Sequence, residues 1–272
     1  MDAEEKEFSF NCFWGNETLK PFVEFSRKGT HYCIYCGSIA NTREHVPSKA
    51  FLKRPLPSDP PVLPACEKCN NSFSPDELYT RTYIECLKAI FVDNNLEILQ
   101  IDPDDRKEKR EAKISIKEAL DQKHFVFDNR IGRILLKLAI GHVVYELSEN
   151  YYFHDWDGDP LYTKYIMRST ISETEWEKLE CAEVMNDKML PEIGSRVFRN
   201  IFVVQPILEK MEGDGELDFG LFMMDWADIQ DDMYRYITYL DRDKLVVKMI
   251  IMDFLYGEVV FQEKRFDNIE NK

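Results

Sequence analysis

The chain has 272 residues, a length that allows one large domain or two modest ones, each with a buried core of its own. Hydrophobic residues make up 44% and charged residues 31%, which is the balance of a globular protein and excludes a disordered or fibrous one. No apolar run approaches the roughly 20 residues of a membrane-spanning helix, and the acidic N-terminus is unlike a secretory signal or a transit peptide. We therefore expect a cytoplasmic protein with no membrane contact.

The net charge of −15 argues against a nucleic-acid partner until its distribution is considered. Between Lys20 and Pro55 seven basic residues stand against two acidic ones, a local charge of +5 that leaves −20 for the remainder. From Glu209 to Asp232 nine carboxylates face the single Lys210. This asymmetry predicts one segment that faces nucleic acid within an acidic body, and chance clustering on a solvated face is the alternative.

The first third of the chain predicts little regular structure before one strong helix. Residues 1–30 indicate an irregular or strand-bearing lead-in with several aromatic anchors, and residues 31–72 are rich in proline and other turn signals. Such a stretch needs something besides regular structure to hold it together. A capping box formed by Ser74 and Glu77, with a proline at the first helical position, then predicts a helix that runs to about residue 93.

The rest of the chain predicts helices first and strands afterwards. Residues 102–123 are charged and indicate a linker or an exposed helix, and residues 130–149 have the apolar spacing of an amphipathic helix. A second capping box at residues 172–175 opens another helix. Residues 200–264 are rich in β-branched and aromatic side chains broken by glycines, a pattern typical of a mostly antiparallel sheet.

Four cysteines carry the strongest chemical signal in the sequence. Cys33 and Cys36 form one CxxC pair, and Cys66 and Cys69 form a second after 29 intervening residues. Two such pairs complete a tetrahedral zinc shell, and four thiolates leave no open position for a catalytic water, so this zinc is expected to be structural. A structural zinc can supply folding free energy on the order of 10 kcal/mol, which the proline-rich stretch between the pairs needs. Four unlinked buried cysteines are the alternative.

The remaining cysteines and histidines predict no second site. Cys12, Cys86 and Cys181 lack partners at ligand spacing and are expected to be core residues. His142 lies on the apolar stripe of its predicted helix and is expected to be a core histidine. The other histidines outside the cysteine loop are not grouped at ligand spacing: His31, His124 and His154.

Two short motifs accompany the cysteine pairs. Residues 42–47 read Thr-Arg-Glu-His-Val-Pro, and residues 69–74 read Cys-Asn-Asn-Ser-Phe-Ser. In their order and spacing these pieces resemble the HNH (ββα-metal) endonuclease family, in particular a bacterial branch whose second CxxC is followed by Asn and a Phe-Ser-x-Asp-Glu segment. The resemblance covers about residues 31–95. It implies an α+β fold in which a zinc-stapled ββα-metal module precedes the helical middle and the β-rich C-terminal half.

The resemblance also implies a chemistry for these motifs. Phosphodiester hydrolysis needs a base that activates water and a divalent cation that stabilises charge on the scissile phosphate. His45 matches the family's general base, and Glu44 and Asn70 match two ligands of a catalytic cation, Mg²⁺ or alternatively Mn²⁺ or Ni²⁺. Basic residues near the motif are the predicted nucleic-acid contacts: Arg43, Lys49, Lys53 and Arg54.

Each of these assignments has a simpler alternative. His45 before Val-Pro could close a turn. Glu44 is one methylene longer than the more usual aspartate and could form a salt bridge to Arg43 or Lys49 instead of binding metal. Asn70 could cap the helix or the cysteine turn.

Glu77 is explained by its capping box, with metal ligation as the second possibility. One position departs from the family pattern, because Pro61 stands where the family often has an asparagine that positions the base. Asp59 or Ser58 could take that role, or the prolines could hold the loop.

The sequence thus predicts an HNH nuclease module in residues 1–100 with its core in residues 31–95, and an α+β domain of unknown role in residues 101–272. The predicted function is metal-dependent hydrolysis of nucleic acid, DNA rather than RNA, and a role in bacterial defence follows only by analogy with the family. The alternative is a non-catalytic zinc-ribbon module that binds nucleic acid or protein. A third possibility is a toxin-like nuclease that is restrained by a regulatory protein partner or by its own acidic half.

Overall fold

The structure is a computed structural model that describes residues 32–58, 60–147, 160–185, 196–204, 221–242 and 244–262, without the side chains of residues 147 and 262. The predicted lead-in, the basic residues before Tyr32 and the first part of the acidic run lie outside these ranges. Within them the fold is a mixed α+β arrangement with a helical middle and a β-rich C-terminal part, as the sequence predicts. No helix in the described ranges is both long and apolar enough to cross a membrane.

The N-terminal part is a small hairpin followed by a long helix. Strands β1 (Thr42–His45) and β2 (Val62–Ala65) pair antiparallel, and helix α1 (Glu67–Phe91) follows one residue later. A 3₁₀ turn, η2 (Lys49–Phe51), lies in the loop between the strands, and η3 (Leu96–Leu99) follows α1. The order strand, strand, helix is the order that the HNH resemblance implies.

Helix α1 begins earlier than the capping-box prediction placed it. Its N-cap is Cys66, whose Sγ accepts a hydrogen bond from Cys69 N at 3.4 Å, and Pro75 lies inside the helix. The prediction at Ser74 was therefore wrong by about two turns. An interior proline normally costs about 3 kcal/mol, and this turn of α1 is held from outside by Arg133, which donates to Ser72 O at 3.2 Å.

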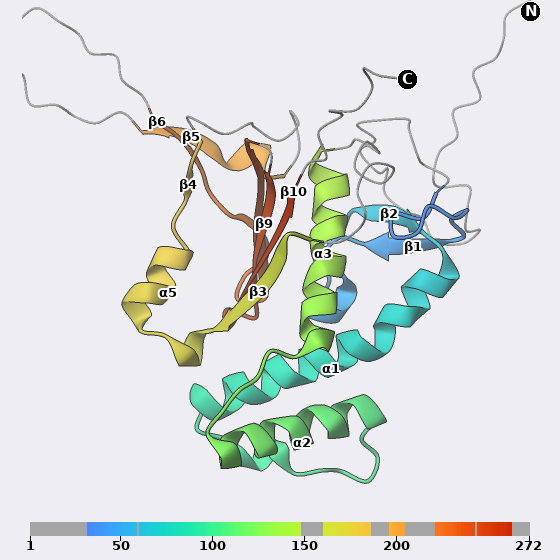
Figure 1. The fold of residues 1–272 in the computed structure, drawn as a ribbon, viewed down its shortest axis with the longest axis vertical. Helices are drawn as coiled ribbons and strands as arrows, with labels where there is room; N and C mark the ends of the chain where they lie inside the picture. The colour runs from blue at the N-terminus through green and yellow to red at the C-terminus, as the bar shows by residue number, and fades with distance from the viewer. Residues whose placement is uncertain are drawn as a thin grey trace, which may run out of the picture.

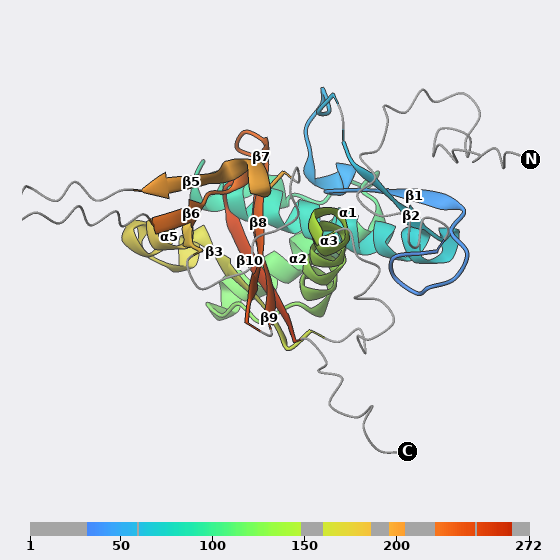
Figure 2. The ribbon, with the colours of Figure 1, turned by 90° about the horizontal axis from the view of Figure 1, so that it is seen from above.

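Two further helices pack against α1. Helix α2 (Lys107–Gln122) confirms the exposed-helix reading of the charged segment, and α3 (Asn129–Leu147) confirms the predicted amphipathic helix. Figure 1 shows α3 upright between the β1–β2 hairpin and the C-terminal sheet, with α1 and α2 crossing below it. The view from above in Figure 2 shows the same arrangement.

The C-terminal part contains two antiparallel sheets. The larger has the strand order β3-β10-β9-β8-β7, and the smaller has the order β4-β6-β5. The short helix α5 (Glu173–Leu179) opens with the predicted capping box, in which Ser172 and Glu175 bond reciprocally. The 3₁₀ turns are η4 (Arg168–Thr170) and η5 (Phe198–Asn200). The strands are β3 (Tyr162–Met167), β4 (Glu183–Val184), β5 (Ile201–Val204), β6 (Leu221–Met224), β7 (Ala227–Gln230), β8 (Tyr234–Asp241), β9 (Lys244–Ile251) and β10 (Leu255–Gln262).

The chain turns between the last two strands at a place other than the predicted one. Gly257 is one of the glycines that were expected to interrupt the strands of residues 200–264, but it lies within β10. There it leaves room for α3, because a Cβ at this position would lie 2.6 Å from Leu135 Cδ2. The hairpin turn is made instead by Met252 and Asp253, both with positive φ, which suits the right-handed twist of the paired strands. Methionine is not a usual turn signal at such a position, whereas aspartate is.

A single hydrophobic cluster joins the helices and the larger sheet. Leu87 of α1, Ile116 of α2, Leu135 of α3 and Val247 of β9 all belong to it. Burying side chains of this size contributes about 1.5–3 kcal/mol each before entropy is counted. The boundary at residue 100 stays a prediction, and α1 shares its buried face with elements on both sides of that residue.

Candidate functional site

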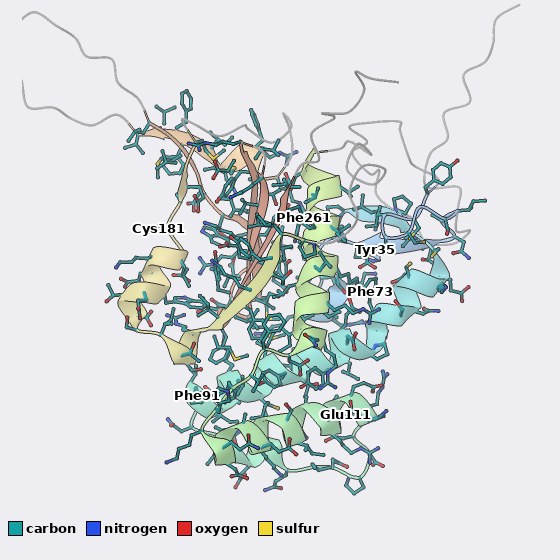
Figure 3. The ribbon with its side chains drawn as sticks, in the orientation of Figure 1. Tyr35, Phe73, Phe91, Glu111, Cys181 and Phe261 are labelled. Carbon is teal, nitrogen blue, oxygen red and sulfur yellow. The ribbon has the colours of Figure 1, made fainter. Side chains whose placement is uncertain are left out.

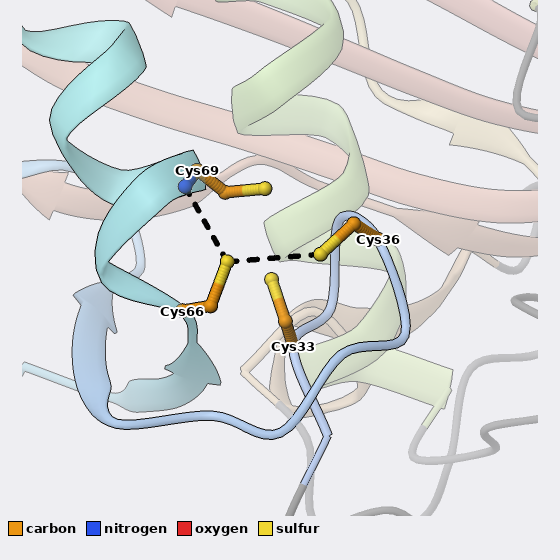
Figure 4. A group of neighbouring side chains, drawn as sticks. All are labelled: Cys33, Cys36, Cys66 and Cys69. Atoms are coloured by element: carbon orange, nitrogen blue, oxygen red, sulfur yellow. Dashed lines mark hydrogen bonds between the residues drawn. The ribbon is translucent and has the colours of Figure 1, made fainter.

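The four predicted zinc cysteines converge in space. Their Sγ atoms all lie within 4.8 Å of one another, and the sulfurs of Cys36 and Cys66 are 3.6 Å apart. Zinc–sulfur bonds of ~2.3 Å in a tetrahedron place sulfurs ~3.8 Å apart. Figure 4 shows the side chains pointing toward one another from a loop and from the start of α1. The cluster is consistent with a structural zinc, and four sulfurs complete its shell.

The first CxxC turn has the backbone geometry that aims two sulfurs at one point. Cys33 N donates to Ser38 O at 2.7 Å, Gly37 N donates to Cys33 O at 2.9 Å, and Tyr35 N donates to Cys33 Sγ at 3.4 Å. Gly37 has a φ of +68°, a conformation that a residue with a Cβ adopts at a cost. Glycine directly after the second cysteine therefore lets this turn close.

The second CxxC pair is built into the end of the hairpin. Asn41 N donates to Ala65 O at 3.1 Å, and Asn41 Oδ1 accepts from Glu67 N at 2.7 Å, so the residue directly before β1 holds the first turn of α1. Cys66 and Cys69 stand at the N-terminus of that helix. The unpaired N–H groups there favour negatively charged ligands such as thiolates.

The thiol pKa values reflect the crowding of the four sulfurs. Burial raises the pKa of Cys33, and hydrogen bonds from Ser38 lower that of Cys36 to about 6. Burial, together with the hydrogen bonds to Cys36 and Cys66, raises the pKa of Cys69. Four thiolates at this distance repel one another, so a bound dication is what allows all four to be ionised together.

The β1–β2 hairpin sets the positions of residues 42–47, which we call the HNH-like motif. Glu44 pairs with Leu63 and His45 with Val62, and successive side chains of a strand point to opposite faces. Glu44 is buried while His45, the last residue of β1, is half-buried. Val46 N donates to Pro61 O at 2.9 Å. Pro61, the departure from the family pattern, thus holds the strand end beside His45 through its carbonyl.

Glu44 is committed to a lysine that the sequence did not single out. Its carboxylate Oε1 lies 3.0 Å from Lys137 Nζ of α3, and both side chains are almost completely buried. The alternative prediction gave Glu44 a salt bridge to Arg43 or Lys49. The salt bridge forms, but its partner is Lys137. Burial raises the pKa of Glu44, and the Lys137 ammonium opposes that shift.

Glu77 also pairs with Lys137, and this corrects the capping-box assignment. Because α1 starts at Glu67, Glu77 lies in the helix interior, where its carboxylate accepts a hydrogen bond from Lys137 Nζ. One feature of the sequence could have indicated Lys137, namely its place three residues after Ile134 beside the apolar stripe of α3. A lysine in that position has to find partners when the stripe is buried.

Asn70 ties the first turns of α1 to β1. Its side-chain nitrogen donates to Thr42 Oγ1 at 3.3 Å and to Arg43 O at 3.2 Å. The N-cap of α1 is Cys66, so the alternative of Asn70 as the helix cap is wrong. The amide oxygen of Asn70 makes no hydrogen bond to any other described residue.

Aromatic side chains cover the space between the cysteine turn and α1. The ring centroids of Tyr35 and Phe73 are 4.9 Å apart. Figure 3 labels both residues near the hairpin. Lys137 Nζ lies 5.3 Å from the centroid of the Phe73 ring. This aromatic cover keeps the lysine and its two carboxylates from water, which strengthens their electrostatic interaction.

The basic residues divide into exposed and partly buried ones. Lys49, Lys53 and Arg54 are exposed on the loop between β1 and β2, whereas Arg43 is partly buried. Gln230 of β7 fastens this loop to the sheet. Lys53 N donates to Gln230 Oε1 at 2.7 Å, and Gln230 Nε2 donates to Lys53 O at 3.0 Å. The end of the acidic run therefore lies beside the exposed lysine and arginine.

The structure also places the other cysteines and His142. Cys86 is buried as predicted, but Cys181 is exposed, so the core assignment for Cys181 was wrong; Cys12 lies outside the described residues. His142 is fully buried as predicted, with Nε2 2.7 Å from Tyr234 Oη, and burial lowers its pKa well below the usual range.

No family model, curated protein or solved structure matches this chain. The relation to HNH endonucleases rests on the residues themselves and remains a prediction.

Proposed function

We propose that the protein is a metal-dependent endonuclease that hydrolyses phosphodiester bonds, with DNA as its substrate. One observation carries the proposal, namely the strand–strand–helix unit that brings His45 to the end of β1 and Asn70 against the same strand. The cysteine cluster lies at the other end of that strand and can stabilise the unit without taking part in the reaction. Exposed basic side chains on the same hairpin supply a surface for phosphate groups.

The chemical roles follow from the residue types. His45 would take a proton from the attacking water, since an imidazole titrates near neutral pH. Glu44 and Asn70 would hold a divalent cation, which would stabilise negative charge on the phosphate and on the leaving oxygen. One observation supports the fit, because Glu44 Oε2 is buried and has no hydrogen-bond partner among the described residues.

A second function has an observation in its favour. Lys137 already forms ion pairs with Glu44 and Glu77, as it would in a zinc-ribbon module that binds nucleic acid or a protein without cutting. Such a module would retain the zinc and the basic loop but would need no catalytic cation. The two functions differ in whether a bound substrate is cleaved.

The test is a cleavage assay with the full chain on supercoiled plasmid, linear duplex, single-stranded DNA and RNA, with Mg²⁺ or Mn²⁺. We expect nicked plasmid to accumulate with either cation and RNA to remain intact. Binding of duplex DNA without cleavage under every cation condition would favour the zinc-ribbon alternative. Cleavage of RNA alone would contradict the substrate assignment.

The exposed loop predicts a defined change in salt dependence. If Lys53 and Arg54 contact phosphates, the double substitution Lys53→Gln plus Arg54→Gln releases about two fewer counterions, so the slope of log K against log salt should become shallower by about 2. The matched control is Lys117→Gln plus Lys123→Gln, which removes two exposed charges on or next to α2. Equal slopes for the two double variants would show that the loop does not contact the phosphates.

A further inference from the structure

Lys137 and two carboxylates form a compact, buried charge cluster. Lys137 Nζ contacts Glu44 Oε1 and Glu77 Oε1, and the exposed fractions of the three side chains are 2%, 5% and 14%. Glu44 comes from β1, Glu77 from α1 and Lys137 from α3. The cluster therefore joins β1, α1 and α3, the three elements that meet at residues 42–47.

The cluster is incompletely neutralised. Among the described residues, two carboxylates face one ammonium, which leaves a formal charge of −1, and no hydrogen-bond partner reaches the buried Glu44 Oε2. The space beside Glu44 is lined by residues that include Tyr35, His45 and Leu138, and it has no room for a water molecule. A buried carboxylate oxygen without partners is costly, so such an atom needs a functional or structural explanation.

Helix α3 delivers the ammonium and is held in place on both sides. Gly141 packs on Val46, where an added Cβ would lie 3.3 Å from Val46 Cγ2, and Leu135 packs on Gly257 of the sheet. One turn away from Lys137, Arg133 bonds Ser72 and Asp76 of α1. The charge that balances Glu44 therefore depends on how α3 sits between the hairpin and the sheet.

We propose that Glu44 and Glu77 form a divalent-cation site that Lys137 keeps closed, so that a cation binds only when the ammonium withdraws. The proposal rests on the proposed function, since it identifies Glu77 and Lys137 as parts of the same cation site. Lys137 is a positioning residue in this scheme, because its burial keeps it from touching a substrate.

Charge and size explain why the Lys137 ammonium and a divalent metal ion cannot occupy the site together. A divalent cation balances both carboxylates and provides a partner for Glu44 Oε2, whereas one ammonium balances a single carboxylate. Mg²⁺ and Mn²⁺ retain several waters when bound, and the closed cluster has no space for them. The apparent affinity for the divalent cation is then the affinity of the open site multiplied by the fraction of molecules in which the site is open.

The test measures Mn²⁺ binding to the zinc-loaded full chain through the loss of the free Mn²⁺ resonance in electron paramagnetic resonance. Removal of the ammonium in Lys137→Gln should tighten Mn²⁺ binding about tenfold or more. The matched control Lys113→Gln removes a partly buried lysine of α2 that pairs with Asp105, and its affinity should equal that of the natural chain. Adding Glu77→Gln to Lys137→Gln should abolish the gain.

Thermal unfolding covers the case in which Lys137→Gln is poorly folded without metal. At roughly a hundredfold excess over Kd, Mn²⁺ should raise the Tm of Lys137→Gln by about 5 °C or more, and it should raise that of Lys113→Gln no more than it raises the natural chain's. Unchanged Mn²⁺ affinity together with no gain in Tm would overturn the proposal. Neither readout depends on cleavage, so a cation site with no nuclease activity would refute the proposed function alone.

Discussion

Replacing His45 by alanine is expected to reduce DNA cleavage about 100- to 10,000-fold, which is the usual loss when a general base is removed. The reason is its place at the end of β1, half-buried and outside the cysteine cluster. Because the four candidate zinc ligands are cysteines and do not include His45, the zinc content of this variant should remain unchanged. The measurement is the initial rate of plasmid nicking at saturating Mg²⁺, together with elemental analysis of the same preparation.

The control for this variant is His124→Ala. His124 is exposed beyond the end of α2, far along the chain from the hairpin, so its loss should leave the nicking rate unaltered. If His45→Ala loses zinc or unfolds at a much lower temperature, His45 closes a turn and the assignment of the base is wrong.

The second large effect concerns the zinc. Cys33→Ser plus Cys66→Ser removes one ligand from each CxxC pair, and we expect the zinc content to fall from one ion per chain to none. Structural zinc contributes folding free energy on the order of 10 kcal/mol, comparable with the whole stability of a typical domain. Apart from cysteines, the hydrophobic cluster beside the four sulfurs has Ala65 as its buried residue, so unfolding of this part should shift to a much lower temperature.

Cys181→Ser is the control for the cysteine variants. Cys181 is exposed and lies on the far side of the sheet from the cluster, as Figure 3 shows, so its substitution should retain one zinc and the natural Tm. A full complement of zinc in the Cys33→Ser plus Cys66→Ser variant would show that the metal is bound elsewhere.

Local sequence patterns predicted the elements that depend on local physics. The periodicity of residues 130–149 predicted α3, and the capping box at Ser172 predicted α5, because both depend on interactions within a few residues. The start of α1 was missed since the segment Ser74 to Glu77 imitates a helix start. What overrides it is Cys66, which caps the helix because the cysteine cluster holds it there.

The part of the site that depends on tertiary packing could not be read from the sequence. The cysteine spacing predicted a cluster that the structure assembles. By contrast, the partner of Glu44 lies 93 positions away on α3, and only the packing of α3 against the hairpin brings Lys137 to it. The roles of His45, Glu44 and Asn70 remain predictions, because contacts alone do not establish catalysis.

In the proposed function the zinc and the catalytic cation have separate roles, and metal add-back to the full chain tests this most directly. Protein treated with chelator until only the cysteine-bound zinc remains should leave supercoiled plasmid intact, and adding Mg²⁺ should start nicking without any change in zinc content. Zinc in a complete shell of four thiolates has no open position for water, which is why it should not support cleavage by itself. Nicking at the same rate before and after Mg²⁺ addition would contradict the account.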